Sequence, residues 1–129
     1  MYDYYFYDER RLPRAFSMPL EFVDFARAQD RPDLSPWWLL CDFPSSADFW
    51  FDQLREQYPE SALVPFAKFG DTDDLACFDG KDLSPSPKVL YIHAFASPGW
   101  EMRGELANFS AWLALAAEDH AEFVKDSAG

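Results

Sequence analysis

The chain has 129 residues, of which 49% are hydrophobic and 19% aromatic, and its formal net charge is −12. This length fits one domain that buries about two-thirds of its unfolded surface without disulfides or metals. The aromatic content predicts a globular fold, since disordered acidic chains are poor in aromatic residues. The excess of carboxylates argues against nucleic acid and anionic membranes as partners. It favours basic partners, or it serves solubility alone.

Two cysteines, Cys41 and Cys77, lie in apolar surroundings and form no Cys-x-x-Cys pair or metal-type cluster. We expect both to be reduced thiols that pack as small hydrophobic side chains. The N-terminus has no basic region followed by an apolar core, and no stretch approaches the roughly 20 apolar residues of a membrane span. We therefore expect no signal peptide and a cytoplasmic location.

The first third of the chain predicts one helix and one strand. Residues 2–7 are aromatic and acidic, which is typical of a short strand or an arm. Pro19 suits the first position of a helix that runs to about Ala28, with Phe22 and Ala26 on its apolar face. Residues 37–42 form a short apolar run between turn signals, which predicts a strand.

A second helix is expected after residues 45–48, whose Ser-Ser-Ala-Asp sequence matches a capping box led by Ser45. Pro59 ends this helix, because proline lacks an N–H and restricts the residue before it. One stripe of the helix is apolar: Ala47, Trp50, Phe51, Leu54 and Tyr58.

The rest of the chain predicts a β-meander followed by a helix. Strands are expected at residues 63–69, 74–79, 88–95 and 100–103, and Pro65 places the first at an edge or early in a strand. Asn108 is a suitable cap for the last helix. The order predicts an α+β fold in a single domain, with an antiparallel β-sheet of about four to six strands flanked by about three α-helices.

Five motifs follow one another in this region: Leu63-Val64-Pro65-Phe66-Ala67, Gly70-Asp71, Asp74-Leu75-Ala76-Cys77-Phe78-Asp79, Val89-Leu90-Tyr91-Ile92-His93 and Asn108-Phe109-Ser110-Ala111-Trp112-Leu113. Their order resembles the SUKH superfamily, which joins bacterial immunity proteins to fungal regulators of cell-wall glucan synthesis. The resemblance is best over residues 63–113, and it implies one SUKH-like, non-enzymatic domain over residues 1–129. Bacterial members look like antidotes that bind a toxin made by the same cell, often a nuclease or deaminase.

An acidic cluster surrounds the second strand of the meander: Asp71, Asp73, Asp74, Asp79 and Asp82. It fails the EF-hand pattern, because Leu75 and Ala76 occupy the fifth and sixth positions. Asp73 and Asp79 also lie at opposite ends of the strand, too far apart to share one ion. We therefore expect no metal. A polar turn bonded to local N–H groups, or a surface for Arg and Lys side chains of a partner, fits the cluster better.

No catalytic set is expected. His93 and His120 fit packed, hydrogen-bonded positions, and neither belongs to a metalloprotease motif. The repeated Ser-Pro of residues 84–87 predicts a surface connection. A small hydrolase or ligand-binding protein that pairs His93 with Cys77 is the remaining enzymatic hypothesis.

Two aromatic runs exceed what one core can bury. Trp37 and Trp38 cannot both face inward on a strand, and a helix cannot bury Phe49 together with Trp50 and Phe51. Such residues indicate either a second packed layer or an exposed aromatic patch. The Tyr-rich N-terminal arm is a further candidate to cover them.

These observations lead to one main hypothesis and one alternative. The main hypothesis is an immunity-type protein without cofactors, which neutralises a cognate, basic protein toxin by binding it. The alternative is a regulatory or scaffold module that binds several endogenous proteins. The residues expected to meet the partner are four carboxylates and one aromatic: Asp71, Asp73, Asp74, Asp79 and Trp100.

Overall fold

The computed structural model describes residues 5–128. Its elements follow the order α1 (Leu20–Arg27), β1 (Trp37–Leu39), a 3-10 turn η1 (Leu40–Asp42), α2 (Pro44–Gln57), β2 (Leu63–Phe69), β3 (Asp74–Asp79), β4 (Val89–His93), β5 (Met102–Leu106) and α3 (Phe109–Ala128). The predicted α+β class is confirmed, with three α-helices and one antiparallel sheet in a single small domain.

The sheet is a meander in which the five strands lie in the order of the sequence, β1-β2-β3-β4-β5, and each pairs antiparallel with the next. β2 is therefore an interior strand, so of the two positions predicted for Pro65 the edge is wrong, whereas the early position holds because Pro65 is the third residue of the strand. A register shift between Pro65 and Ala67 lets the interior strand accommodate a residue that lacks an N–H.

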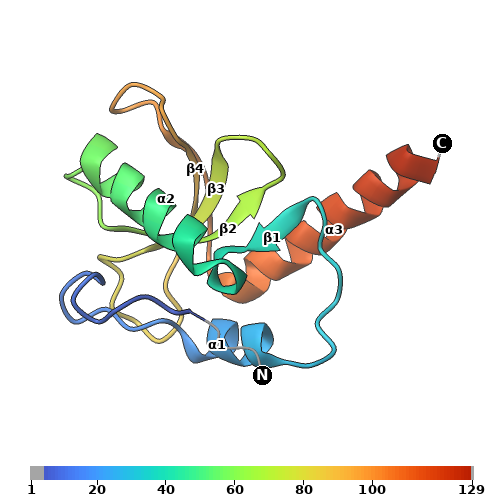
Figure 1. The fold of residues 1–129 in the computed structure, drawn as a ribbon, viewed down its shortest axis with the longest axis horizontal. Coiled ribbons are helices and arrows are strands. Elements are labelled where there is room, and N and C mark those ends of the chain that lie inside the picture. The colour runs from blue at the N-terminus through green and yellow to red at the C-terminus, as the bar shows by residue number, and fades with distance from the viewer. Residues whose placement is uncertain (1–4, 129) are drawn as a thin grey trace.

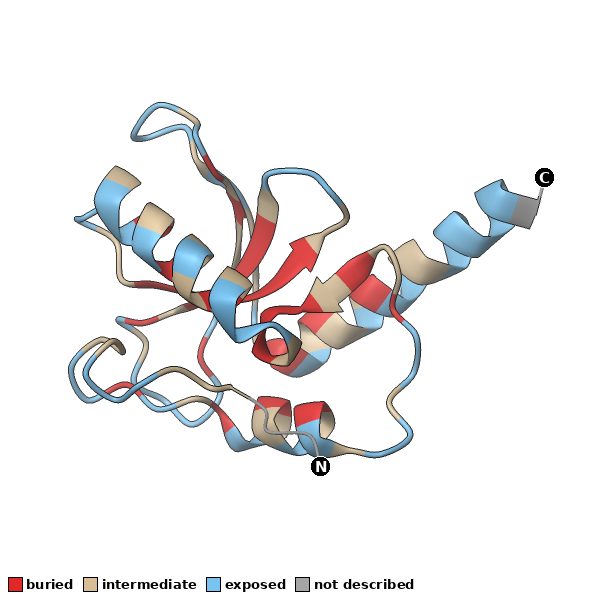
Figure 2. Ribbon diagram, viewed as in Figure 1, coloured by how far each residue is buried: buried red, intermediate tan, exposed pale blue. Residues whose placement is uncertain are grey.

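Helices cover both faces of the sheet. In Figure 1, α2 lies on one side of the strands, whereas α1 and the first half of α3 lie on the other. β2 and β3 are buried along most of their length, as expected for strands covered on two faces. Figure 2 shows this burial as a band of red through the middle of the molecule.

The core on the α1 and α3 side is mainly aromatic. Phe66 and Phe78 are stacked with ring centroids 4.3 Å apart, and Phe22 meets both edge-on. From α3, Phe109 and Trp112 pack onto Phe66, with centroids 5.7 and 5.0 Å away. Burial of each large ring removes well over 100 Å² from water, so this cluster supplies much of the stability.

The core on the α2 side is smaller and mainly aliphatic. Leu54 of α2 and Tyr58, the residue that follows the helix, face Leu75, Cys77 and Ile92 of the sheet. The arm, the segment that precedes α1, also reaches this core, where the Tyr7 hydroxyl donates to the Pro65 carbonyl over 2.6 Å. Residues 2–4 lie outside the described residues, and residues 5–7 form this arm without being a strand.

Several element boundaries differ from the predictions. α2 begins at Pro44 after Phe43, with no side-chain cap, so the capping box at Ser45 is wrong. Proline suits this first position because its missing N–H has no partner there in any helix. Asp48 instead accepts the Tyr5 hydroxyl at 2.6 Å. Asn108 caps α3 as predicted, through a 3.0 Å bond from the Ala111 N–H.

The predicted strands at 63–69 and 74–79 have the limits that the sequence indicates, and the strand predicted at 88–95 is shorter, Val89–His93. The predicted strand at 37–42 ends at Leu39 and continues as the 3-10 turn, and the last strand is Met102–Leu106, not 100–103.

The C-terminal part of α3 projects beyond the rest of the domain, and residues 121–127 are all exposed (Figure 2). Within residues 5–128, no helix has the length and apolarity to cross a membrane.

Candidate partner-binding site

Two loops meet at one end of the sheet, which we call the hairpin end: the β2–β3 turn (residues 70–73) and the β4–β5 loop (residues 94–101). They adjoin because β3 and β4 are neighbours, with Asp74 opposite His93. A 2.9 Å bond from the Ala94 N–H to the Asp73 carbonyl ties one loop to the other. Both loops project from the upper end of the sheet in Figure 1. The hairpin end collects most of the residues that the sequence singles out.

Asp71 and Asp73 are exposed on the β2–β3 turn. The turn is held by its own backbone and by Thr72, whose hydroxyl donates to the Phe69 carbonyl at 2.6 Å and accepts from the Asp74 N–H at 3.1 Å. Over the described chain, neither the Asp71 nor the Asp73 carboxylate makes a hydrogen bond or an ion pair. Two negative charges are thus presented to solvent on a structured turn.

Asp74 begins β3 and is already engaged. Its Oδ1 lies 2.6 Å from His93 Nδ1, and the two side chains are 47% and 38% exposed. The pair fixes the imidazole through one nitrogen, a His–carboxylate arrangement that also occurs in general bases. Catalysis would further require a nucleophile or a metal next to the ring.

The two thiols do not supply that nucleophile. Cys77 belongs to the α2-side core, whereas His93 pairs with Asp74 at the hairpin end, so among the described residues no hydrogen bond joins the two members of the alternative His93–Cys77 hypothesis. Burial raises the pKa of Cys77 well above its ordinary range and that of Cys41 to about 12. Both are free and buried, as the sequence indicates. Among residues 5–128, no group of three or more His, Cys, Asp or Glu side chains is arranged to hold a metal.

The β4–β5 loop carries two exposed aromatic residues. Trp100 is 74% exposed and Phe95 is 58% exposed. The loop is fastened at the C-terminal end of α2. Gln57, the last residue of the helix, accepts the Phe95 N–H at 2.6 Å, and the hydroxyl of the next residue, Tyr58, donates to the Ala96 carbonyl at 2.7 Å. The rings are therefore displayed by an anchored loop at the hairpin end, where the β2–β3 turn also carries the exposed Asp71 and Asp73.

An aromatic strip continues from Phe95 along α2. Trp50 lies 6.0 Å from Phe95 and 5.2 Å from Phe49, which is 52% exposed. The buried Lys68 amine lies near the Trp50 and Trp38 rings, 5.4 and 5.8 Å from their centroids. The sequence left a second packed layer and an exposed patch open as alternatives, and the structure contains both: Trp37 and Trp38 pack against opposite cores, whereas Phe49 stays exposed.

Asp79 lies apart from the other predicted residues, because it ends β3 at the opposite end of the sheet. Its carboxylate accepts the Lys81 N–H at 3.0 Å. Asp82 accepts hydrogen bonds from the N–H groups of Lys88 and Ser84, which lower its pKa. The hairpin end is thus defined without Asp79.

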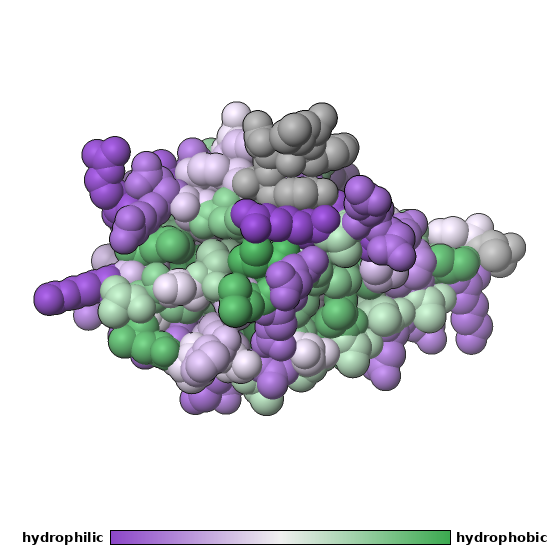
Figure 3. Space-filling view, turned by 90° about the horizontal axis from the view of Figure 1, so that it is seen from below, coloured by the Kyte–Doolittle hydropathy of each residue, from purple (hydrophilic) through white to green (hydrophobic). Residues whose placement is uncertain are grey.

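Figure 3 shows the molecule from the side of α1, away from the hairpin end, where apolar and charged side chains are intermixed.

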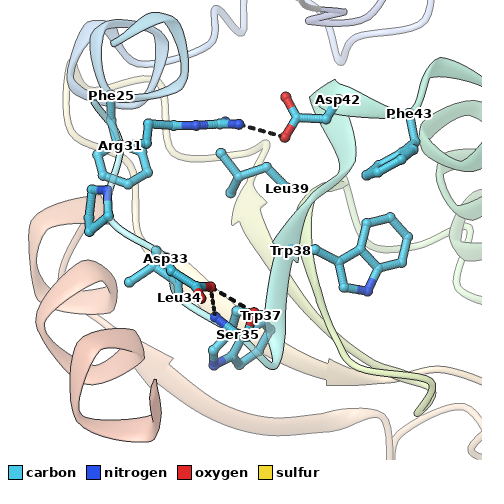
Figure 4. A pocket seen from close by; sticks show the side chains of 11 residues that line it. Phe25, Arg31, Asp33, Leu34, Ser35, Trp37, Trp38, Leu39, Asp42 and Phe43 are labelled. Carbon is cyan, nitrogen blue, oxygen red and sulfur yellow. Dashed lines mark hydrogen bonds and ion pairs between the residues drawn. The ribbon is translucent and has the colours of Figure 1, made fainter. Parts of the chain in front are cut away.

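One cavity, of about 410 Å³, lies along the outer edge of β1. Figure 4 shows Arg31 and Asp42 pointing toward each other across it, joined by a 2.8 Å ion pair. On the other side, Asp33 accepts the backbone and hydroxyl of Ser35 at 2.9 and 2.7 Å. The Asp33 and Asp42 carboxylates are thus satisfied within the protein, which leaves this cavity little charge to offer a ligand.

A second cavity, of about 310 Å³, opens beside the hairpin end between the sheet and α3. Sequence reasoning did not identify it. The alternation of β4 predicts that Tyr91 and His93 lie on one face of the sheet. Whether Asp119 reaches the cavity depends on the angle at which α3 packs across the sheet, and no sequence pattern predicts that angle.

Comparison with protein-family models, curated proteins and solved structures gives no match for this chain. The resemblance to the SUKH superfamily therefore stays a prediction from the sequence.

Proposed function

We propose that this chain is a non-enzymatic, immunity-type protein that binds and neutralises a cognate basic protein toxin through its hairpin end. The observation that carries the proposal is that two loops tied by the bond from the Ala94 N–H to the Asp73 carbonyl expose the unpaired carboxylates of Asp71 and Asp73 and the ring of Trp100. The resemblance of residues 63–113 to bacterial immunity proteins supports the same function, and reduced thiols support action in the cytoplasm.

The chemistry of the surface supports a protein partner of positive charge. Exposed tryptophan is enriched among the residues that dominate binding energy, because a large ring gains much when it enters a pocket. Carboxylates at the rim contribute chiefly by accelerating encounter with a cationic partner. The net charge of −12 acts in the same direction over longer distances.

A binding role without turnover fits the way the reactive groups are placed. The thiols lie inside the cores, and the His93 ring is held by a carboxylate with no thiol beside it. Neutralisation by binding requires only a stable surface, and the hairpin end is anchored by hydrogen bonds from Tyr58, which follows α2, and from Thr72.

The test is a tagged pull-down from the native host at low and at high salt, with mass spectrometry of the retained proteins. We expect one dominant basic protein in equal stoichiometry that is toxic when expressed alone and harmless when this chain is co-expressed. Many weak partners without a toxic one would favour the scaffold alternative and overturn the proposal.

A matched pair of variants then tests the surface. With the purified partner, Asp71→Asn/Asp73→Asn should slow association and reduce its salt dependence. Asp79→Asn, at the other end of β3, should leave association close to that of the unmodified protein. Equal effects of the two variants would show that the hairpin end is not the binding surface.

A further inference from the structure

The 310 Å³ cavity beside the hairpin end has three aromatic walls. Trp37 and Tyr91 are stacked with centroids 5.8 Å apart and planes inclined by 30°, and Phe69 meets Trp37 edge-on at 5.0 Å. The remaining lining residues come from β3, β4, β5 and α3: Asp74, Ile92, Arg103, Leu115 and Asp119. Rigid aromatic walls of this kind suit a flat or cationic guest.

The cavity also contains a polar atom without a partner. The Tyr91 hydroxyl oxygen is buried, and within residues 5–128 it makes no hydrogen bond. A buried hydroxyl left unpaired costs about 1–3 kcal/mol, so such groups are uncommon and call for an explanation. A guest that donates a hydrogen bond to this oxygen would satisfy it.

Negative charge lies next to that hydroxyl. Asp119 of α3 accepts the Trp37 indole N–H through Oδ2 at 2.9 Å, and within the described chain its Oδ1 has no hydrogen bond. Burial, and secondly the Asp119 carboxylate, raise the pKa of Tyr91 to about 12, so the phenol is neutral at physiological pH. Asp74, bonded to His93, adds a second carboxylate to the lining.

One positive side chain lines the cavity as well. Arg103 donates through Nε to the Trp100 carbonyl at 3.0 Å, which directs part of its guanidinium to the β4–β5 loop. Two carboxylates against one guanidinium leave an excess of negative charge among the residues that line the cavity. The cavity thus favours a cationic guest, with Arg103 as a competitor.

We infer that this cavity receives one arginine side chain of the basic partner, with the guanidinium stacked on the aromatic wall and bonded to Asp119 and Tyr91. The inference rests on the proposed function for the identity of the partner, but the cavity's preference for a guanidinium is a property of this chain. Arginine fits better than lysine, because a planar fork with five donors reaches two acceptors on different elements while it stacks on a ring.

The test does not require the partner. N-acetyl-arginine amide is titrated into ¹⁵N-labelled protein, with N-acetyl-citrulline amide as the neutral control of the same shape. We expect saturable shifts of the Trp37 indole N–H and of the Tyr91 and Asp119 amides, with a Kd in the millimolar range for the arginine amide alone. The absence of such shifts, or equal shifts with citrulline, would overturn the inference.

Three variants sharpen the test. Tyr91→Phe removes only the unpaired hydroxyl, so it should keep or raise the stability while the Kd of the arginine amide rises by a few-fold to about tenfold. Arg103→Gln removes the competitor and should tighten binding, and Asp79→Asn should change nothing. An unchanged Kd in Tyr91→Phe, or weaker binding in Arg103→Gln, would contradict the assignment.

The two proposals can fail separately. If a toxic partner binds through Asp71 and Asp73 but arginine amide leaves the Trp37 signal unmoved, the inference about the cavity is wrong and the proposed function stands. If the amide binds as expected and no toxic partner exists, the cavity is a guanidinium site in a protein of another function.

Discussion

The imidazole of His93 meets the carboxylate of Asp74 at 2.6 Å, which joins the last residue of β4 to the first residue of β3. The register places these residues directly opposite each other, and both project toward the hairpin end. The pair therefore marks where the regular sheet stops and the two loops begin. It holds the base of the loops and leaves Asp71 and Asp73 free.

Replacement of Asp74 by Asn tests how much the pair contributes. Its side chains are 47% and 38% exposed, and ion pairs this accessible to water contribute about 0–1 kcal/mol. We expect Asp74→Asn to lower the free energy of unfolding by less than about 1 kcal/mol in urea titrations. A double-mutant cycle with His93→Gln measures the interaction energy between the two side chains. An interaction energy above about 2 kcal/mol would contradict the expectation that the pair contributes little to stability.

Trp100→Ala separates binding from folding. The ring is 74% exposed, so its removal should change the free energy of unfolding by no more than about 0.5 kcal/mol. If the ring is an anchor for the partner, the same change should weaken the complex by about 2 kcal/mol, or roughly thirtyfold in Kd. Calorimetric titration with the purified partner measures this loss.

A matched control at another exposed hydrophobic residue is available for that experiment. Leu83 is 58% exposed on the β3–β4 loop, away from the hairpin end. Leu83→Ala should leave both stability and the Kd of the complex nearly unchanged. Equal weakening by Leu83→Ala and Trp100→Ala would mean that the partner contacts another surface.

The sequence predicted the fold because its local signals agree with its packing. The alternation of Val89 and Tyr91 with Leu90 and Ile92 corresponds to two different cores, and the α2 stripe buries Ala47, Phe51 and Leu54 as expected. The capping box at Ser45 would make Ser46 the first helical residue, but the helix begins two positions earlier, at Pro44, which suits that place equally well. Local sequence is compatible with a helix that begins at either position. The hydrogen bond between Asp48 and Tyr5 joins segments far apart in the sequence, so no local pattern could predict it.

The site was predictable only in part, for a physical reason. Residues in one turn, such as Asp71 and Asp73, come together because the chain is short between them. Asp79 was grouped with them because it is close in sequence. The intervening strand β3 is extended, however, and each of its residues adds about 3.3 Å to the distance between Asp79 and the turn. The contact between Trp37 and Asp119 joins segments 82 positions apart, and only the packing of α3 determines it.

Gly80→Ala tests the packing at the other end of the sheet. A Cβ there would lie 2.4 Å from the Ala62 carbonyl oxygen and 2.6 Å from the Pro13 ring. Since a backbone oxygen cannot rotate away, we expect a loss of about 1–3 kcal/mol in the free energy of unfolding. At Gly104 the nearest atoms to a new Cβ all belong to the Tyr91 side chain, the closest a ring carbon at 3.2 Å, so Gly104→Ala should cost less. A larger loss of stability for Gly104→Ala than for Gly80→Ala would show that residues 62 and 80 are packed differently.

The buried thiols predict how stability depends on alkaline pH. In the unfolded chain a thiol ionises near pH 8.5. In the folded protein Cys41 stays protonated until about pH 12 and Cys77 beyond that, because burial disfavours the thiolate. Above about pH 8.5 the unfolded state therefore binds fewer protons than the folded state, so the free energy of unfolding falls as pH rises. Below that value the contribution is fully present.

The size of the effect makes it measurable. Each thiol that is ionised only in the unfolded state lowers the free energy of unfolding by up to about 1.4 kcal/mol per pH unit. Urea titrations between about pH 8.5 and 10 should show this decline before the ordinary tyrosine range is reached. Cys41→Ala/Cys77→Ala should flatten the slope, whatever its effect on stability at neutral pH. Rapid labelling of both thiols by a disulfide reagent in the folded protein at pH 8 would contradict the burial on which the decline depends.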